Sequence, residues 1–78
     1  MHQFYVQFHC LRYVLDFVTL ASKKKSRLIV GNDHFQVNAN SFMGIFTLNF
    51  RKPQRVTVNC AEEEFRQILA DFGRFLAT

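Results

Sequence analysis

The stretch Val37-Asn38-Ala39-Asn40-Ser41-Phe42-Met43-Gly44 takes the chain from a predicted strand into a predicted helix. Its asparagines and Ser41 are residue types whose side chains accept hydrogen bonds from the free amides of a helix start. Residues 35–37 alternate as a strand does, and the spacing becomes helical after Ser41. Arg51-Lys52-Pro53 ends that helix. The apolar residues at helical spacing are Phe42, Met43, Phe46 and, further along, Phe50.

The segments on both sides of this stretch predict short strands. Arg27-Leu28-Ile29-Val30 is mostly apolar, and the turn signal Gly31-Asn32-Asp33 follows it, so residues 27–37 predict a hairpin. Downstream, Arg55-Val56-Thr57-Val58 alternates as the last strand. Asn59-Cys60-Ala61-Glu62 then resembles a capping box, in which a cap residue is followed three positions later by Glu. The last predicted helix has an acidic start, Glu62, Glu63 and Glu64, and an apolar stripe, Phe65, Ile68, Leu69, Phe72 and Leu76.

The N-terminal part of the chain predicts one strand followed by one helix. Residues 3–8 alternate, with Phe4, Val6 and Phe8 on one face, which is typical of a half-buried strand. From residue 11 the period becomes helical, and Lys23-Lys24-Lys25 complements the negative end of that helix. The predicted apolar stripe is Leu11, Val14, Leu15, Val18 and Ala21, and the polar side carries Arg12, Asp16 and Thr19.

The predicted order is β-α-β-β-α-β-α, without a linker or a low-complexity stretch. A sheet with one apolar face must have that face covered, and helices with apolar stripes can cover it. The sequence therefore predicts an α+β fold, an open-faced two-layer sandwich that forms a single domain over residues 1–78. With 78 residues, 49% apolar and 21% charged, the composition is globular and excludes disordered chains and multi-domain regulators.

Phenylalanine is the unusual feature of the composition, with ten copies and no tryptophan. Because its side chain brings a large apolar area and no polar atom, it suits a dense core or an adhesive surface. The spacing assigns Phe4, Phe8, Phe65 and Phe72 to the core.

Signals for export, membrane insertion, metals and cofactors are missing from the sequence. The sequence has no run of about 18 apolar residues that could span a membrane, and its first residues lack the features of a signal peptide. We therefore expect a cytoplasmic protein whose cysteines, Cys10 and Cys60, are reduced thiols, with a Cys10–Cys60 bridge as the alternative. The histidines and cysteines show no metal-ligand spacing, so neither a metal nor a cofactor is expected.

The Val37–Gly44 stretch resembles the HPr family, the small phosphocarrier proteins of the bacterial sugar phosphotransferase system, whose pattern there is V-N-x-K-S-I-M-G. Ala21-Ser22-Lys23 also matches the family's A-S-K, and a gap-free match runs from about Cys10 to Cys60. The resemblance implies a four-stranded antiparallel sheet of order 1-4-2-3, with three helices on one face. It also implies a role in sugar transport as a phosphocarrier rather than as a free-standing enzyme.

The phosphate site departs from the family pattern H-A-R-P. The gap-free match places Cys10-Leu11-Arg12-Tyr13 there, so Arg12 is kept, Cys10 replaces the phosphorylated histidine and Tyr13 replaces the proline. A helix start favours an anion such as a phosphohistidine, because its amides are free and its dipole end is positive. The loss of the histidine puts phosphotransfer itself in question.

Three interpretations of this site stay open. His9, one residue earlier, is a chemically suitable acceptor, because a neutral imidazole is a nucleophile near neutral pH. Cys10 is a second acceptor, since a helix start favours the thiolate form of a thiol, and the same relay uses a phosphocysteine on a sugar-permease domain. The third, which we favour, is a chain that no longer carries phosphate and only docks or regulates, because a fold can persist after its site is lost.

The resemblance also implies a regulatory serine and a docking face. Ser41 matches the serine that a dedicated kinase phosphorylates in Gram-positive members, which controls carbon catabolite repression, although a cap is its simpler role. The implied partners are enzyme I, sugar-permease components, the serine kinase and a transcription regulator. The docking residues would be Leu11, Arg12, Tyr13, Phe42, Met43 and Phe46, with positive charge from Arg12, Lys24 and Arg27. We expect Phe42 and Phe46 to be partly exposed and Met43 less so.

A small nucleic-acid-binding module is the alternative from another functional class. The net charge is +4, and basic residues are interleaved with aromatic ones. Phe4, Tyr5 and Phe35 could form a stacking platform on the open sheet face. No RNP-type or GXXG motif is present, and the lysine run is short, so the sequence favours protein docking.

Overall fold

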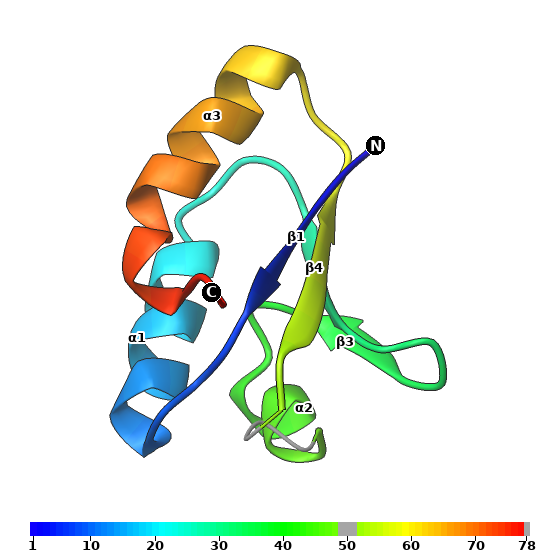
Figure 1. Cartoon of the computed structure of the whole chain (residues 1–78), viewed down its shortest axis with the longest axis vertical. Coiled ribbons are helices and arrows are strands. Elements are labelled where there is room, and N and C mark those ends of the chain that lie inside the picture. The colour runs from blue at the N-terminus through cyan, green and yellow to red at the C-terminus, as the bar shows by residue number, and fades with distance from the viewer. Residues whose placement is uncertain (49–51, 78) are drawn as a thin grey trace.

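The computed structural model describes residues 1–48 and 52–77, and its elements follow the predicted order (Figure 1). Phe50 and Arg51, which the sequence placed at the end of the second helix, lie outside the described residues. The strands are β1 His2–Val6, β2 Leu28–Gly31, β3 Gln36–Asn38 and β4 Gln54–Val58. The helices are α1 Leu11–Ala21, α2 Phe42–Phe46, α3 Glu62–Asp71 and a short 3-10 turn, η1 Gly73–Phe75.

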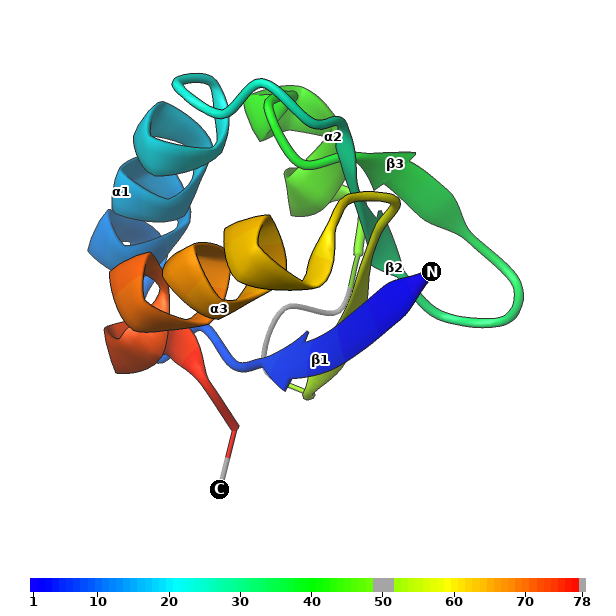
Figure 2. The same ribbon diagram turned by 90° about the horizontal axis from the view of Figure 1, so that it is seen from above.

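The four strands form one antiparallel sheet of order β1-β4-β2-β3, as the family resemblance implied. Val56 lies at its centre, opposite Phe4 on one side and Val30 on the other, and Val30 faces Val37 of β3. The three helices cover one face of the sheet and leave the other face open (Figure 2). The predicted α+β open-faced sandwich is confirmed.

The core lies between the sheet and the helices and is rich in phenylalanine. Phe17 of α1 is fully buried and packs against Phe8 with 5.0 Å between ring centroids, Phe72 at 5.1 Å and Phe75 at 5.5 Å. Burial of such large apolar side chains is the main stabilising contribution available to a chain of this size. Of the four phenylalanines that the spacing assigned to the core, three are buried and Phe65 packs partly buried against them.

The buried face of α1 differs from the predicted stripe. Val14, Phe17 and Ala21 point into the core, whereas Leu11 and Leu15 are exposed. Both faces fit a helical period, so periodicity does not decide which one packs. Phe17 decides it, because only this rotation of the helix places the largest side chain among the other buried rings.

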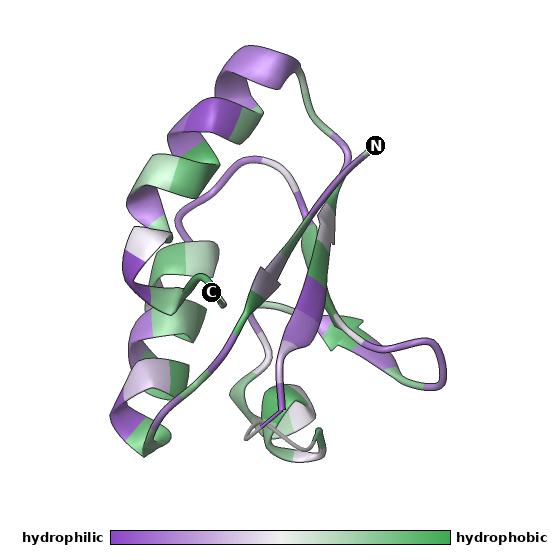
Figure 3. Cartoon of the chain, viewed as in Figure 1, coloured by the Kyte–Doolittle hydropathy of each residue, from purple (hydrophilic) through white to green (hydrophobic). Residues whose placement is uncertain are grey.

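The last helix also differs from its prediction at both ends. The predicted capping box is wrong, because α3 begins after Ala61, and no side chain caps it. The acidic start is confirmed, with Glu62, Glu63 and Glu64 in the first turn, which Figure 3 shows as hydrophilic.

At the other end α3 stops at Asp71, and the chain turns back toward β1 through η1. Phe75 therefore fills the core position expected of Leu76, and Leu76 forms a bridge with Val6 instead. The strand β1 likewise ends at Val6 rather than at Phe8, although Phe8 still points into the core. Beyond it, the amide of Gln7 donates a hydrogen bond to the carbonyl of Phe75 at 2.8 Å.

Candidate functional site at the starts of α1 and α2

Cys10 is the N-cap residue, immediately before α1. Its backbone is extended, with φ −161° and ψ 172°, and its carbonyl accepts a hydrogen bond from the amide of Tyr13 at 3.1 Å. Its side chain forms no capping hydrogen bond, and the first turn of α1 holds no acidic residue. The thiol is exposed and free. This arrangement leaves an accessible sulfur atom at the positive end of the helix.

His9, the other candidate acceptor, lies on the surface next to Cys10. Its ring meets the ring of Tyr13 edge-on, with 5.4 Å between the centroids. Tyr13 in turn lies beneath the guanidinium of Arg74, 4.9 Å from its ring centroid. Tyr13, in the first turn of α1, therefore contacts both the ring of His9 and the guanidinium of Arg74.

Arg12 points into solvent on the same turn, and its side chain is 78% exposed. Its Nε lies 3.4 Å from Oδ1 of Asp16, and Nη1 of Arg74 lies 3.3 Å from Oδ2 of the same carboxylate. Sequence reasoning missed Arg74, because it follows Arg12 by most of the chain length and no local pattern connects the two. The return of the chain through η1 brings them together.

The start of α2 is built differently. Ser41 caps it, and its hydroxyl oxygen accepts a hydrogen bond from the amide of Gly44 at 3.1 Å. A side chain at Gly44 would meet this same oxygen at 3.0 Å and Val37 at 3.1 Å, so glycine permits the close approach. The predicted cap is confirmed, and the hydroxyl is occupied by its structural role.

An exposed apolar surface lies on α1 and α2, which contact each other. Met43 is 72% exposed and Phe46 40%, and the half-buried Phe42 packs edge-on against Phe46 with 4.7 Å between centroids. The prediction that Met43 is less exposed than its neighbours is wrong, because α2 turns Ile45 into the core and thereby turns Met43 outward. We call the exposed Leu11, Met43 and Phe46, together with the half-buried Tyr13 and Phe42, the apolar face.

Of the three cations expected near this face, Lys24 forms an ion pair with Asp71 of α3. Its ammonium donates a hydrogen bond to Oδ2 of Asp71, which lowers the pKa of that carboxyl. Gln67 donates a second hydrogen bond to Oδ1 of Asp71 at 3.1 Å, which lowers the pKa further. Arg12 and Arg27 stay exposed to solvent.

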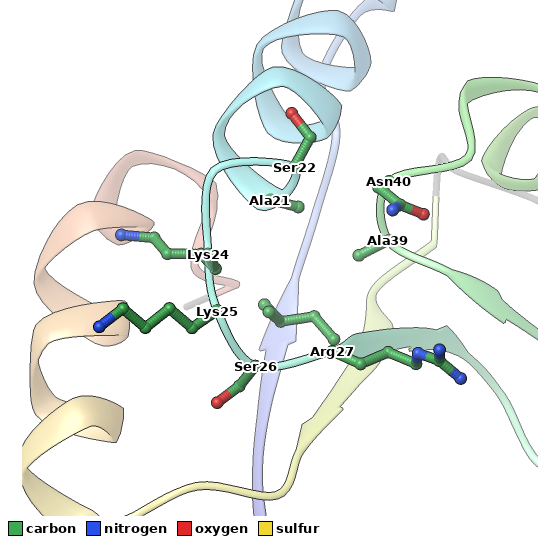
Figure 4. Close-up of a pocket in the computed structure, with 9 residues that line it drawn as sticks. Ala21, Ser22, Lys24, Lys25, Ser26, Arg27, Ala39 and Asn40 are labelled. Atoms are coloured by element: carbon green, nitrogen blue, oxygen red, sulfur yellow. The ribbon is translucent and has the colours of Figure 1, made fainter.

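A hollow of about 190 Å³ opens beside Asn40, between the loop after α1 and the loop after β3 (Figure 4). The side chains of Lys24 and Lys25 point to one side of it and that of Arg27 to the other. The charged groups therefore do not converge on one point, and the hollow offers no defined ligand position.

The other site classes find little support in the described part of the chain. Residues 1–48 and 52–77 hold no group of three potential metal ligands and no helix long and apolar enough to cross a membrane. The proposed stacking platform for nucleic acid loses Phe4, which lies in the core, while Tyr5 and Phe35 are exposed. Cys10 and Cys60 are both free thiols, and burial together with the nearby Glu64 raises the pKa of Cys60.

Comparisons with known proteins agree on one family. A family model described as the PTS HPr component phosphorylation site matches residues 10–78, so the match begins at Cys10. Among the solved structures that match is the crystal structure of HPr-C-His from Thermoanaerobacter tengcongensis, with a TM-score of 0.71 and 30% sequence identity. That alignment covers 92% of this chain and 90% of the other. No curated protein matches the sequence.

Proposed function

The chain belongs to the HPr family of phosphocarrier proteins, and we propose that it is a docking and regulatory member acting in the sugar phosphotransferase system. One observation carries this proposal: Cys10 is the residue immediately before α1, and the gap-free sequence match assigns this position to the phosphorylated histidine of the family pattern. In this match the acceptor differs, whereas Arg12 and an apolar face beside it are present. Such a chain can still bind the partners of the family without receiving phosphate from them.

The apolar face supports the docking part of the proposal. Leu11, Met43 and Phe46 are exposed on two helices that contact each other, so one partner surface can cover them together. Covering apolar side chains releases about 25 cal/mol for each Å² removed from water. Arg12 adds a positive charge at the edge of this face, which favours an acidic partner and speeds its approach. The partners we propose are enzyme I, the first enzyme of the relay, and the sugar-permease components.

The test measures docking and phosphate uptake separately. The purified chain is titrated into enzyme I by calorimetry, and in parallel it is incubated with phosphoenolpyruvate and enzyme I and its intact mass is recorded. We expect binding without the mass gain of one phosphate. Phe46→Ala should weaken the binding, and Phe35→Ala, an exposed aromatic change at the distant hairpin, serves as the matched control.

Two results would contradict the proposal. Absence of binding would remove the docking role, and uptake of one phosphate would make the chain an active carrier.

An active phosphocarrier is the second candidate, and the exposed thiol of Cys10 favours it because capping does not occupy the side chain. In this reaction the thiolate sulfur attacks the phosphorus of the phosphohistidine on enzyme I. The S–P bond forms as the N–P bond breaks, and the electron pair stays on the imidazole nitrogen. Phosphate uptake abolished by Cys10→Ser assigns the acceptor to the thiol, and uptake abolished by His9→Ala assigns it to the imidazole.

Phosphorylation of Ser41 is the proposed switch that controls docking at the apolar face. A phosphate there adds close to two negative charges at the start of α2, one residue from Phe42 and two from Met43. Docking of partners over Met43 and Phe46 would then change without unfolding of the chain. Incubation with ATP and the family's serine kinase should add one phosphate to the chain and none to Ser41→Ala. No uptake by the unaltered chain would remove the switch, and with it the proposed link to a transcription regulator.

A further inference from the structure

Two arginines share one carboxylate on the side of α1 that faces η1. Nε of Arg12 lies 3.4 Å from Oδ1 of Asp16, and Nη1 of Arg74 lies 3.3 Å from Oδ2. A guanidinium has five N–H donors, so each arginine keeps donors that this shared contact does not use. The side chains of Arg12 and Arg74 are 78% and 54% exposed, so those donors are accessible from solvent.

A groove of about 310 Å³ adjoins this cluster, between α1 and the end of α3. It is lined by Asp16, Leu20, Lys23, Asp71, Arg74 and Phe75, among others, and we call it the arginine groove. In the view of Figure 2, α2 lies beside α1 and η1 lies below it, so the two adjoin different sides of α1. The arginine groove is therefore a surface separate from α2, connected to the apolar face through the first turn of α1.

The charges around the arginine groove do not balance. Both carboxylates already have partners: Asp16 lies between Arg12 and Arg74, and Asp71 is held by Lys24. Among residues 1–48 and 52–77, Lys23 forms no ion pair. Of the described residues, Arg12, Lys23, Lys24 and Arg74 thus meet two carboxylates here, and a ligand carrying carboxylates would complete the pairing.

Two aromatic rings also contact the guanidinium of Arg74, the group that would bind such a ligand. Its guanidinium lies over the ring of Tyr13 at 4.9 Å and over that of Phe75 at 5.3 Å. Stacking on aromatic rings orients the planar group and reduces the conformational entropy lost when it binds a carboxylate.

We propose that the arginine groove binds an acidic segment of the same protein partner that covers the apolar face, with a partner carboxylate placed between Arg12 and Arg74. This inference rests on the proposed docking function and extends it to Arg74 and Lys23. Its basis is the charge imbalance, together with the continuity of the two surfaces at the first turn of α1.

The test uses two variants that lose the same ion pair but have opposite expected effects. Affinity for full-length enzyme I is measured by calorimetry at low salt, and circular dichroism confirms that each variant is folded. Arg74→Gln removes a donor to the partner and should weaken binding roughly fivefold. Asp16→Asn removes the internal competitor and frees both guanidiniums, so it should strengthen binding about threefold.

A matched control makes the same change of charge outside the groove. Arg66 is 75% exposed and pairs with Glu62 four residues earlier on α3, much as Arg12 pairs with Asp16. Arg66→Gln should leave the affinity unchanged. Lys23→Gln should weaken binding, and its effect should shrink at high salt, because screening reduces the attraction between exposed charges.

The outcomes separate the failure of this inference from the failure of the docking function. If Asp16→Asn and Arg74→Gln both weaken binding, the pair has only a structural role, and the inference is overturned. The same holds if Arg74→Gln behaves like Arg66→Gln while Phe46→Ala still weakens binding; the docking function then survives. If the unaltered chain does not bind enzyme I, both the docking function and the inference are overturned.

Discussion

The starts of α1 and α2 differ in whether a side chain caps the free backbone amides of the helix. Both follow a residue with extended backbone, Cys10 for α1 and Ser41 for α2. The hydroxyl of Ser41 accepts a hydrogen bond from an amide of its helix, whereas the side chain of Cys10 forms no such bond. The helix α2 has five residues and buries one of them, while α1 has eleven and buries three.

The difference indicates where a side chain is available for function. A short helix gains little from packing, so its cap contributes a substantial part of its stability. A longer helix with several buried side chains can leave its cap position unused. The side chain at the start of α1 is therefore accessible to partners or reactants, whereas a modification of Ser41 has to displace an existing hydrogen bond.

Phe17→Ala tests whether packing stabilises α1, and it should have the largest effect on the free energy of unfolding. Removal of a fully buried ring that touches three others should lower the free energy of unfolding by about 3–5 kcal/mol, measured by urea denaturation. Leu15→Ala, an exposed change on the same helix, is the control and should have a much smaller effect. Equal losses would mean that the buried face of α1 has been assigned wrongly.

Alanine at each helix start tests the comparison directly. Ser41→Ala should lower the free energy of unfolding by about 1 kcal/mol, because the amide of Gly44 loses its acceptor. Cys10→Ala should change it very little, and Cys10→Ser should raise it if the new hydroxyl caps α1. The distinction between the two starts fails if Cys10→Ala costs as much as Ser41→Ala in the same denaturation experiment.

The two thiols should react at different rates. Cys10 is exposed, whereas burial and the nearby Glu64 raise the pKa of Cys60, so less of its reactive thiolate is present at neutral pH. Alkylation at pH 7, followed by mass spectrometry of the fragments, should label Cys10 roughly threefold faster or more. The rate at Cys60 should rise steeply toward alkaline pH, and replacement of Glu64 by Gln should raise it at neutral pH. Faster labelling of Cys60 at pH 7 would contradict the assignment.

The smallest expected effect is at the other end of α1, where Lys24 holds Asp71. The hydrogen bond from Lys24 lowers the pKa of Asp71 below the ordinary value of 3.8. A carboxyl whose pKa is lowered by folding stabilises the folded state above its ordinary pKa, and this contribution is lost as the pH falls through the lowered value. Asp71→Asn should therefore show a smaller loss of stability between pH 4 and pH 2 than the unaltered chain, measured by thermal unfolding. Identical acid profiles would show that the pair contributes nothing to stability.

Local patterns predicted what depends on neighbouring residues. The order of strands and helices, the hairpin between β2 and β3 and the cap at Ser41 all follow from spacing and side-chain chemistry within a few positions. The strand order came from the family resemblance of the Val37–Gly44 stretch, because periodicity carries no information about which strands pair.

The candidate site was only partly predictable for the same reason. Cys10 and Arg12 could be placed at a helix start, and the apolar residues of α2 at a surface, from their positions in sequence. The exposure of Met43 depended on which way α2 turned, and the contacts of Arg74 depended on the return of the chain through η1. Neither feature has a signal at the level of local spacing.

The sequence by itself therefore determined the order of the elements, the globular composition and the presence of Cys10 and Arg12 at a helix start. The tertiary structure decided which face of each helix is buried, and it brought Arg12, Asp16 and Arg74 together. The physical reason is that hydrogen bonding and capping act over a few residues, whereas packing selects among several faces that satisfy the same period. Burial of Phe17 and Phe75 made that selection, and the surface left outside the core is the one available for partners.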